Sequence, residues 1–251
     1  MCLFVMDRAF AQGLPACSGP SVGRPTAVVR IGQGGELLLR DGRIAHLEGI
    51  RLPLGSRDHA PDSFGRDAHN ALSSLAIGRA LTLTGVSPIE DRYGRLRVQA
   101  FANQDWIQVE LLGQGLARVS IAPDRADCAA ELYEAEARGR AMRAGLWSAS
   151  AYSIRRPNAL DRDLGTFQVV EGHVVSVSER EGHAWLLFAS QPGARFAAYV
   201  SEDDLRTFRA MGVDPKGYEG QSVRVRGIVQ DLSGPAIAIA NPMQVEVIGQ
   251  N

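Results

Sequence analysis

Between residues 26 and 50, short runs of alternating or apolar residues are separated by glycine-rich turns. The runs cover residues 26–31, 36–40 and 43–50, and the turns between them contain Gly34-Gly35 and Asp41-Gly42. Alternation with a period of two is typical of β-strands, and glycine pairs are typical of the turns that connect them. The pattern therefore predicts a meander of three strands.

The pattern then changes to a helical period. Residues 62–77 carry apolar side chains at intervals of three and four, with Asp62 or Ser63 as the expected N-cap and Gly78 as the expected stop. Residues 81–84 and 96–101 would supply two further strands. A shorter apolar helix pattern follows at 109–117, and Pro123-Asp124 is expected to open a long helix that closes near Gly145.

The pattern after residue 164 is again that of strands. Residues 149–164 show little periodicity, so we expect a linker there, and a short helix is expected near 202–211. The expected strands are 167–177, 184–189, 195–200, 223–229, 236–240 and 244–248. Five or six short strands and one helix predict a second small barrel that is OB-like.

Length and charge set the bounds on function. A chain of 251 residues is long for one small barrel and sufficient for two domains. No apolar run approaches the roughly 18–20 residues that a membrane-spanning helix needs. The formal net charge is −1, so nucleic-acid binding would have to come from a local basic patch. The five histidines show no spacing typical of a metal site.

The cysteines and the amino-terminal segment point to export. Ala9-Phe10-Ala11 matches the small-residue rule for signal-peptide cleavage, so we interpret residues 1–11 as the remnant of a signal peptide. Cleavage there would remove Cys2 and leave Cys17 and Cys128 as a disulfide candidate in a periplasmic or secreted protein. The alternative is a cytoplasmic protein with free thiols.

One ordered series of motifs resembles a known family. An Asp91-Arg92-Tyr93-Gly94-Arg95 turn leads into a strand, an apolar helix pattern with Gly-Leu-Ala follows, and a second helix ends in Ala-Gly-Leu-Trp at 144–147. This order resembles the staphylococcal nuclease (thermonuclease) family over about residues 25–150. The resemblance implies a mainly β fold with helices (α+β), in which a nuclease-like OB barrel at 25–148 follows an arm at 1–24. The linker at 149–164 and the second OB-like barrel at 165–251 complete the expected order.

The chain departs from the chemistry that the resemblance implies. In that family an Asp-Gly-Asp-Thr turn carries the metal carboxylate of a calcium-dependent phosphodiesterase, and the matching stretch here is Gln33-Gly34-Gly35-Glu36. Aligned on Pro53, the phosphate arginine becomes His46, the second metal aspartate becomes Arg51 and the general base becomes Leu54. Leucine cannot activate water. We therefore assign no catalytic residue, no metal ligand and no cofactor.

What remains of the family's pattern is the arginine turn. Arg95 matches a family phosphate ligand and keeps Arg92 and Tyr93 beside it, whereas the tyrosines that stack on the base are replaced by Ile121 and Pro123. We expect a catalytically degenerate protein that binds single-stranded nucleic acid, nucleotide phosphates or another phosphate-bearing ligand weakly. The candidate ligand residues are Arg95, which would carry most of the binding, and Arg92, Tyr93, Arg51 and His46.

Two alternatives remain open. One is an active metal-dependent nuclease, which would need calcium and relocated ligands drawn from Glu36, Glu48 and Asp58; we expect Glu48 to lie on a solvated strand face. The other is a periplasmic module that binds a protein or cell-wall partner. In the second barrel, Arg224 and Arg226 are interpreted as a solvated strand face, with a phosphate-binding track as the alternative.

Overall fold

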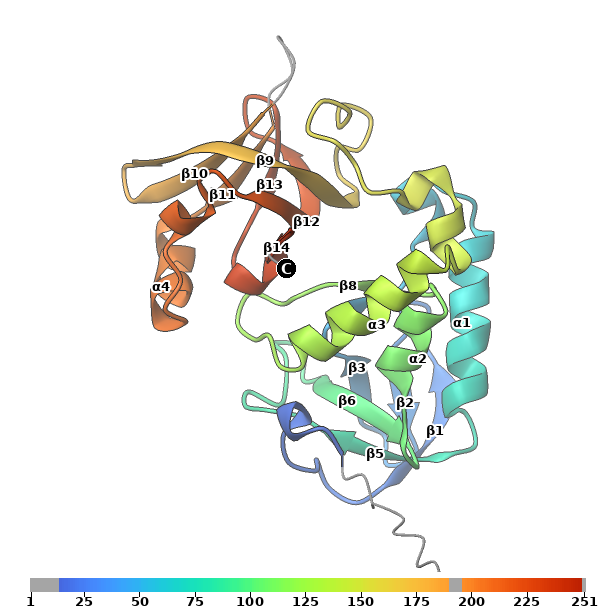
Figure 1. The fold of residues 1–251 in the computed structure, drawn as a ribbon. Coiled ribbons are helices and arrows are strands. Elements are labelled where there is room, and N and C mark those ends of the chain that lie inside the picture. The colour runs from blue at the N-terminus through green and yellow to red at the C-terminus, as the bar shows by residue number, and fades with distance from the viewer. Residues whose placement is uncertain (1–13, 190–195, 250–251) are drawn as a thin grey trace, which may run out of the picture.

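The computed structural model describes residues 14–189 and 196–249 and contains two small β-barrels with helices at their rims (Figure 1). The α+β class and the tandem OB-like barrels predicted from the sequence are confirmed. The expected signal-peptide remnant at 1–11, with Cys2, lies outside the described residues. No helix in the described part of the chain combines the length and apolar character that crossing a membrane requires.

The first barrel closes from five strands in the order β1-β2-β3-β6-β5, in which β3 and β6 pair in parallel and the other neighbours are antiparallel. Short strands β4 and β8 pair with each other beside it. The strands are β1 (Thr26–Ile31), β2 (Leu37–Leu39), β3 (Ile44–Leu47), β4 (Ile50–Arg51), β5 (Ala80–Thr84), β6 (Leu96–Ala102), β7 (Asp105–Trp106) and β8 (Arg118–Val119).

Three helices cover this barrel: α1 (Ser63–Ala76), α2 (Ile107–Gly113) and α3 (Ala129–Ala141). Their apolar faces pack on one core that includes Leu37, Leu72, Leu111 and Leu132. The long helix begins at Ala129, so the predicted start at Pro123-Asp124 is wrong. The intervening residues form a turn in which Asp124 pairs with Arg97 of the barrel and Arg125 pairs with Asp127 within the turn.

The second barrel has the same strand order and the same parallel closure. Its ring runs β9-β10-β11-β13-β12, and β14 extends the sheet from β12. In both barrels a helix follows the third ring strand along the chain: α1 lies between β3 and β5, and α4 lies between β11 and β12. The elements are β9 (Phe167–Arg180), β10 (His183–Phe188), β11 (Ala197–Val200), α4 (Glu202–Ala210), β12 (Ser222–Asp231), β13 (Pro235–Ala238) and β14 (Val245–Val247).

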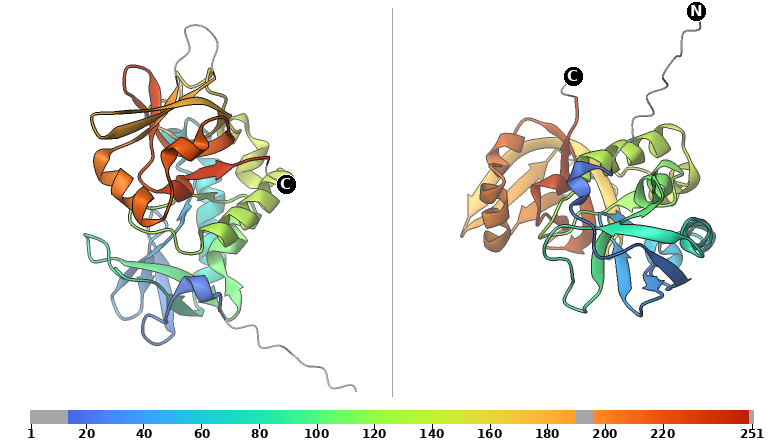
Figure 2. Two further views of the ribbon diagram at one scale, coloured as in Figure 1. Left: turned by 60° about the vertical axis from the view of Figure 1, so that its left-hand side comes forward. Right: turned by 90° about the horizontal axis from the view of Figure 1, so that it is seen from below.

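Cys17 and Cys128 form a disulfide in the structure. The bond joins a short 3-10 helix, Ala16–Ser18, to the residue before α3, across a sequence separation of 111. The amino-terminal arm is therefore tied to the helical side of the first barrel, as the cysteine pattern predicts. The views in Figure 2 show the blue segment lying against that barrel.

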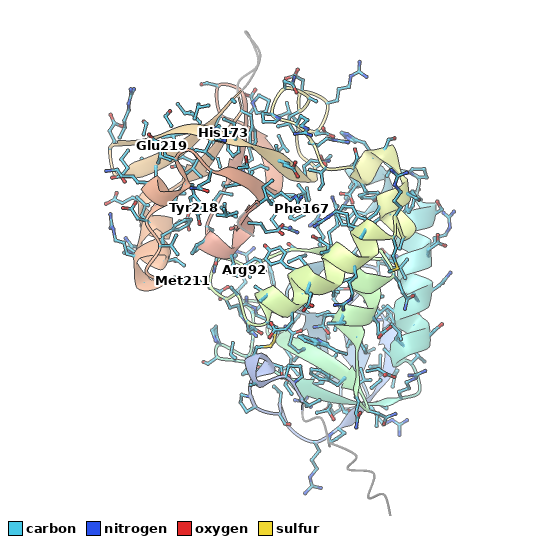
Figure 3. The ribbon with its side chains drawn as sticks, viewed as in Figure 1. Arg92, Phe167, His173, Met211, Tyr218 and Glu219 are labelled. Atoms are coloured by element: carbon cyan, nitrogen blue, oxygen red, sulfur yellow. A yellow bond between two sulfur atoms is a disulfide. The ribbon has the colours of Figure 1, made fainter. Side chains whose placement is uncertain are left out.

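The two barrels meet through buried charges. Arg226 on β12 is fully buried, and its guanidinium pairs with Glu136 on α3 at 3.0 Å and lies 4.4 Å from the centre of the Tyr133 ring. Arg118 on β8 donates to the carbonyl of Phe167, the first residue of β9, at 2.6 Å. Phe167 lies on the side of the second barrel that faces α3 (Figure 3).

This contact corrects the interpretation of the Arg224–Arg226 pair as a solvated strand face. Arg224 is half-buried and pairs with Glu171, but Arg226 has no exposed surface. The strand face that would meet water in an isolated barrel is covered by α3 of the other barrel, which supplies the carboxylate that the buried guanidinium needs.

Candidate functional site

A cavity of about 180 Å³ opens on the first barrel where the β1–β2 turn approaches β3, β4 and the segment after them. Its polar lining comes from His46 on β3, Arg51 on β4 and Ser120 just after β8. The complete lining is Gly34, Gly35, His46, Leu47, Ile50, Arg51, Leu52, Leu54 and Ser120. The positions that the sequence analysis matched to the metal turn, the phosphate arginine, the second metal ligand and the general base thus surround one cavity.

Arg51 carries a positive charge into this cavity without a counter-ion. Strands β4 and β8 place Arg51 opposite Arg118. Of the two, Arg118 takes the nearby carboxylate, because its guanidinium nitrogen lies 2.9 Å from Asp58 Oδ2. Arg51 forms no ion pair and no side-chain hydrogen bond with any residue in the part of the chain that the structure describes, and its Nε is buried without a partner.

The surroundings of Arg51 make its charge costly. Its guanidinium carbon lies 5.5 Å from the centre of the Phe167 ring, which comes from the second barrel. Burial lowers the pKa of Arg51, and the charge of Asp58 opposes that shift. Arginine nevertheless stays protonated in proteins, so two arginines share one carboxylate here. An anion in the cavity would supply the missing negative charge.

His46 provides a weakly basic group beside Arg51. Desolvation lowers the pKa of His46, Glu48 raises it, and Arg95 lowers it further. The imidazole is therefore neutral at pH 7 and can accept or donate one hydrogen bond without adding charge. It does not replace the permanent charge of the arginine that the nuclease family places here.

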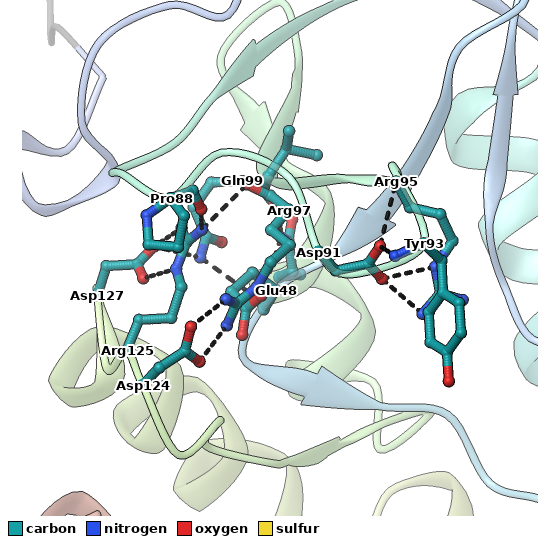
Figure 4. Close-up of polar contacts among 12 residues, drawn as sticks. Glu48, Pro88, Asp91, Tyr93, Arg95, Arg97, Gln99, Asp124, Arg125 and Asp127 are labelled. Atoms are coloured by element: carbon teal, nitrogen blue, oxygen red, sulfur yellow. Dashed lines mark hydrogen bonds and ion pairs between the residues drawn. The ribbon is translucent and has the colours of Figure 1, made fainter.

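Arg95 is already paired within its own turn (Figure 4). Its Nε and one terminal nitrogen each lie 2.7 Å from Asp91 Oδ2, and a second terminal nitrogen lies 3.6 Å from Glu36 Oε1. Asp91 Oδ1 also accepts the backbone N–H groups of Tyr93 and Arg95. Burial alone would raise the pKa of Asp91, but these hydrogen bonds lower it. The turn itself needs Gly94, whose φ of 71° favours glycine.

Tyr93 is exposed and carries the two flanking arginines on its ring. The guanidinium carbons of Arg92 and Arg95 lie 4.9 and 5.2 Å from the ring centre. The sequence-predicted residues thus fall into two groups. Arg51 and His46 line the cavity, whereas Arg92, Tyr93 and Arg95 form a surface turn whose Arg95 contacts Glu36, the carboxylate that accepts the N–H of the cavity residue Gly34.

The carboxylates that could hold a relocated metal ion are each bound elsewhere. Glu36 accepts the N–H of Gly34 at 3.0 Å, and Glu48 pairs with Arg97 at 2.8 Å. Asp58 Oδ2 accepts the N–H of Leu54 at 2.9 Å in addition to pairing with Arg118, and Asp58 Oδ1 is buried without a hydrogen-bond partner among the described residues. Glu48 is 5% exposed, so the prediction that it lies on a solvated face is wrong; a buried guanidinium from β6 compensates its charge.

Gly35, which stands where the family's turn has its second aspartate, is unfavourable for a side chain because of its backbone conformation and a contact with Leu52. Its φ is 87°, and a Cβ there would lie 2.5 Å from Leu52 Cδ1. Among the described residues, only Cys17, Cys128 and Glu131 form a cluster of three groups of metal-binding type, and the two sulfurs of that cluster are bonded to each other. The donor set around the cavity does not fit calcium, which needs several converging oxygen ligands.

The segment in which Ile121 and Pro123 replace the family's base-stacking tyrosines leads into an ion-pair network (Figure 4). Asp124, which follows Pro123, binds both terminal nitrogens of Arg97 at 2.5 and 2.8 Å. Its pKa is lowered by this hydrogen bonding to Arg97. Arg125 and Asp127 form a second pair at 2.7 Å next to it. Aromatic stacking surface is thus replaced by paired charges.

The sequence analysis missed this network, although a signal was present. Strand β6 reads Leu-Arg-Val-Gln-Ala-Phe-Ala and is buried on both faces. Polar residues at alternate positions of a strand covered on both sides must face buried partners. Arg97 finds Glu48 and Asp124, and Gln99 accepts a hydrogen bond from the indole of Trp106.

The closed five-stranded ring with its cavity at this position defines a nuclease-like OB barrel. Comparison with known proteins names the family: residues 45–149 match the family model of staphylococcal nuclease homologues, so the chain contains a domain of this family.

Two curated relatives match the same region. An uncharacterized 38.1 kDa protein of Capnoides sempervirens is 36% identical over 115 residues, which are 46% of this chain and 31% of that protein. The staphylococcal-like nuclease CAN1 of Arabidopsis thaliana is 33% identical over 118 residues, which are 47% of this chain and 33% of that protein. The chain therefore spans about a third of the length of these relatives.

Proposed function

We propose that the first barrel is a catalytically degenerate nuclease domain that binds a phosphate group of a ligand, such as single-stranded nucleic acid, without hydrolysing it. The observation that carries this proposal is the uncompensated guanidinium of Arg51 in the cavity. A phosphate oxygen would give Arg51 the charged partner that Asp58 gives Arg118.

The loss of hydrolysis follows from the groups around the same cavity. Leu54 stands at the position of the general base and cannot accept a proton. The carboxylates of Glu36, Glu48 and Asp58 are each bound to other groups. Metal and general-base contributions are together expected to account for most of a phosphodiesterase's rate, so their joint loss leaves binding as the remaining activity.

We propose that Arg51, with His46 and Ser120 in support, is the main phosphate ligand, and that the turn of Arg92, Tyr93 and Arg95 contributes less. Binding through Arg95 would require it to share its guanidinium with Asp91 and Glu36. Because Ile121 and Pro123 stand where the family has its stacking tyrosines, the ligand would be held by its phosphate and not by base stacking.

A titration of a fluorescent single-stranded oligonucleotide at several salt concentrations tests this proposal. Arg51→Ala should weaken binding and lower the salt slope by about one phosphate contact, or somewhat less for a single strand. Arg79→Ala removes an exposed arginine just after α1 and serves as the control for net charge. Equal losses in the two variants would reject a specific role for Arg51, and a loss confined to Arg95→Ala would move the site to the surface turn.

We also propose that the protein is exported, with residues 149–164 linking the two domains. The Cys17–Cys128 disulfide supports export, because structural disulfides are rare in reducing compartments. Both cysteines found oxidised in protein recovered from the periplasm or medium would agree with this proposal. Recovery from the cytoplasm with free thiols would contradict it.

A further inference from the structure

The second barrel presents an aromatic surface that has no part in the function proposed above. The outward side chains of β10 and β11 include His183, Trp185 and Tyr199. Trp185 and Tyr199 are cross-strand partners whose ring centres lie 4.6 Å apart, and the rings of His183 and Tyr199 stack at 5.4 Å. The Tyr199 hydroxyl lies 2.7 Å from His183 Nδ1. We call these three residues the aromatic row.

Two residues of the aromatic row have small partners on the neighbouring strands. Ser178 of β9 is the partner of Trp185, and Ala238 of β13 is the partner of Tyr199. Trp185 and Tyr199 therefore have no bulky partner on these strands, whereas the β9 partner of His183 is Arg180. All three rings are partly exposed, as aromatic side chains on a free surface are.

The aromatic row borders a hollow of about 490 Å³. Among the described residues, no charged side chain lines this hollow, and most of the lining is apolar. The lining is Val175, Trp185, Leu187, Phe188, Phe196, Ala197, Leu232, Ser233, Gly234, Pro235 and Ala236. A concave, largely apolar hollow with a few polar groups at its edge is the usual form of a small-ligand site.

This face is free of the first barrel. The second barrel contacts its neighbour through Phe167, Arg226, Asn241 and Met243, which lie at the start of β9, on β12 and on the segment that leads into β14. The aromatic row belongs instead to β10 and β11. In OB folds the face of the second and third strands, which are β10 and β11 here, binds oligonucleotides and oligosaccharides.

Charge decides between these two ligand classes. Residues 165–251 contain seven arginine and lysine residues against ten aspartate and glutamate residues. Binding of nucleic acid depends on cations that neutralise phosphates. An acidic barrel with an uncharged hollow lacks that contribution, whereas a neutral sugar chain requires only ring faces to pack on and hydroxyl or imidazole groups to bond.

We propose that the β10–β11 face of the second barrel binds a neutral oligosaccharide. Trp185 and Tyr199 would pack against the C–H-rich faces of successive sugar rings, and the Tyr199 hydroxyl and His183 would bond sugar hydroxyls at the edge. The apolar hollow beside Trp185 would take an apolar substituent on the sugar, such as the methyl of an acetamido group. The preferred ligand is therefore an N-acetylated glycan.

Chitohexaose and cellohexaose are suitable matched probes, because they differ in the acetamido group. With the full chain, calorimetry should show binding of chitohexaose that is tighter than that of cellohexaose. In NMR spectra of the unmodified protein, chitohexaose should shift the signals of His183, Trp185 and Tyr199. This second measurement needs no variant and therefore does not depend on how a variant folds.

Trp185→Ala should weaken chitohexaose binding by about tenfold or more, as removal of a stacking ring does in other aromatic sites. Trp147→Ala removes a partly buried tryptophan outside the hollow and should leave binding unchanged, as should Arg51→Ala, which separates this proposal from the phosphate site. No binding at millimolar glycan, or shifts located elsewhere, would overturn the proposal. Tighter binding of single-stranded DNA or a proline-rich peptide at the aromatic row would also overturn it.

Discussion

Arg51 and Arg118 lie opposite each other on β4 and β8, yet Asp58 pairs with Arg118 alone. The second arginine is left at the wall of a cavity, beside an aromatic ring from the other barrel. Two arginines beside one carboxylate thus connect the contact between the barrels, where Arg118 binds the Phe167 carbonyl, to the candidate site. This arrangement is also the reason why we propose an anion as the ligand of this cavity.

The first prediction concerns Asp58. Asp58→Ala would leave Arg118 buried without its carboxylate, and breaking a buried pair in this way typically costs about 3–5 kcal/mol. Urea unfolding of the variant should show this loss. Glu134→Ala breaks an exposed helical pair with Arg138 and should change stability by less than about 1 kcal/mol. Similar effects of the two substitutions would contradict the structural role given to Asp58.

Removal of the Cys17–Cys128 disulfide should destabilise the fold. A closed loop of this size constrains the unfolded chain by about 4–5 kcal/mol in the chain-entropy description. The double variant Cys17→Ser with Cys128→Ser should therefore unfold at a clearly lower urea concentration than the oxidised protein. Reduction of the wild-type protein should give the same shift, and an unchanged midpoint would count against this stabilising role.

The pH dependence of binding should report His46. Desolvation lowers the pKa of His46, so the imidazole is neutral at pH 7 and gains its proton only as the pH falls below its ordinary range near 6.5. Protonation adds positive charge to the cavity, so affinity for an oligonucleotide should rise as the pH falls from 7 to 5. Phosphodiesters keep one negative charge throughout this range. His46→Gln should flatten the profile, and a profile with the same slope in both proteins would exclude His46.

Gly35→Asp restores the family's aspartate in sequence and should not restore a metal site. The new Cβ would clash with Leu52 at a positive φ, with an expected cost of about 1–3 kcal/mol for the backbone strain alone. Gly42→Asp is a matched control, because Gly42 has a φ of 86° and no atom within 4 Å of an added Cβ. Calorimetry should detect no calcium binding by either variant. Tight calcium binding by Gly35→Asp would show that the donor set fits the metal after all.

Local signals made the barrels, the arginine turn and the disulfide predictable. The Arg-Tyr-Gly-Arg turn depends only on Gly94 and on the hydrogen bonds that Asp91 makes within four residues. The five residues 91–95 are therefore sufficient to predict it. The alternation of each strand likewise depends on its own residues.

The buried charges could not be predicted in this way, because their partners are distant in sequence. Glu48 is 49 residues from Arg97, and Arg226 is 90 residues from Glu136 and belongs to the other barrel. A strand pattern distinguishes two faces but does not tell whether another element covers the outer one. The lack of an ion-pair partner for Arg51 among the described residues could not be predicted for the same reason. Asp58 is close to both Arg51 and Arg118, and it pairs only with Arg118.

The most direct test of the central claim is a cleavage assay on single-stranded DNA with and without calcium, run at protein concentrations that saturate binding. The proposed degenerate domain should bind the DNA, bind it more weakly in Arg51→Ala and produce no calcium-dependent products. Calcium-dependent cleavage that disappears in Glu36→Gln or Asp58→Asn would contradict it and establish an active nuclease with relocated ligands.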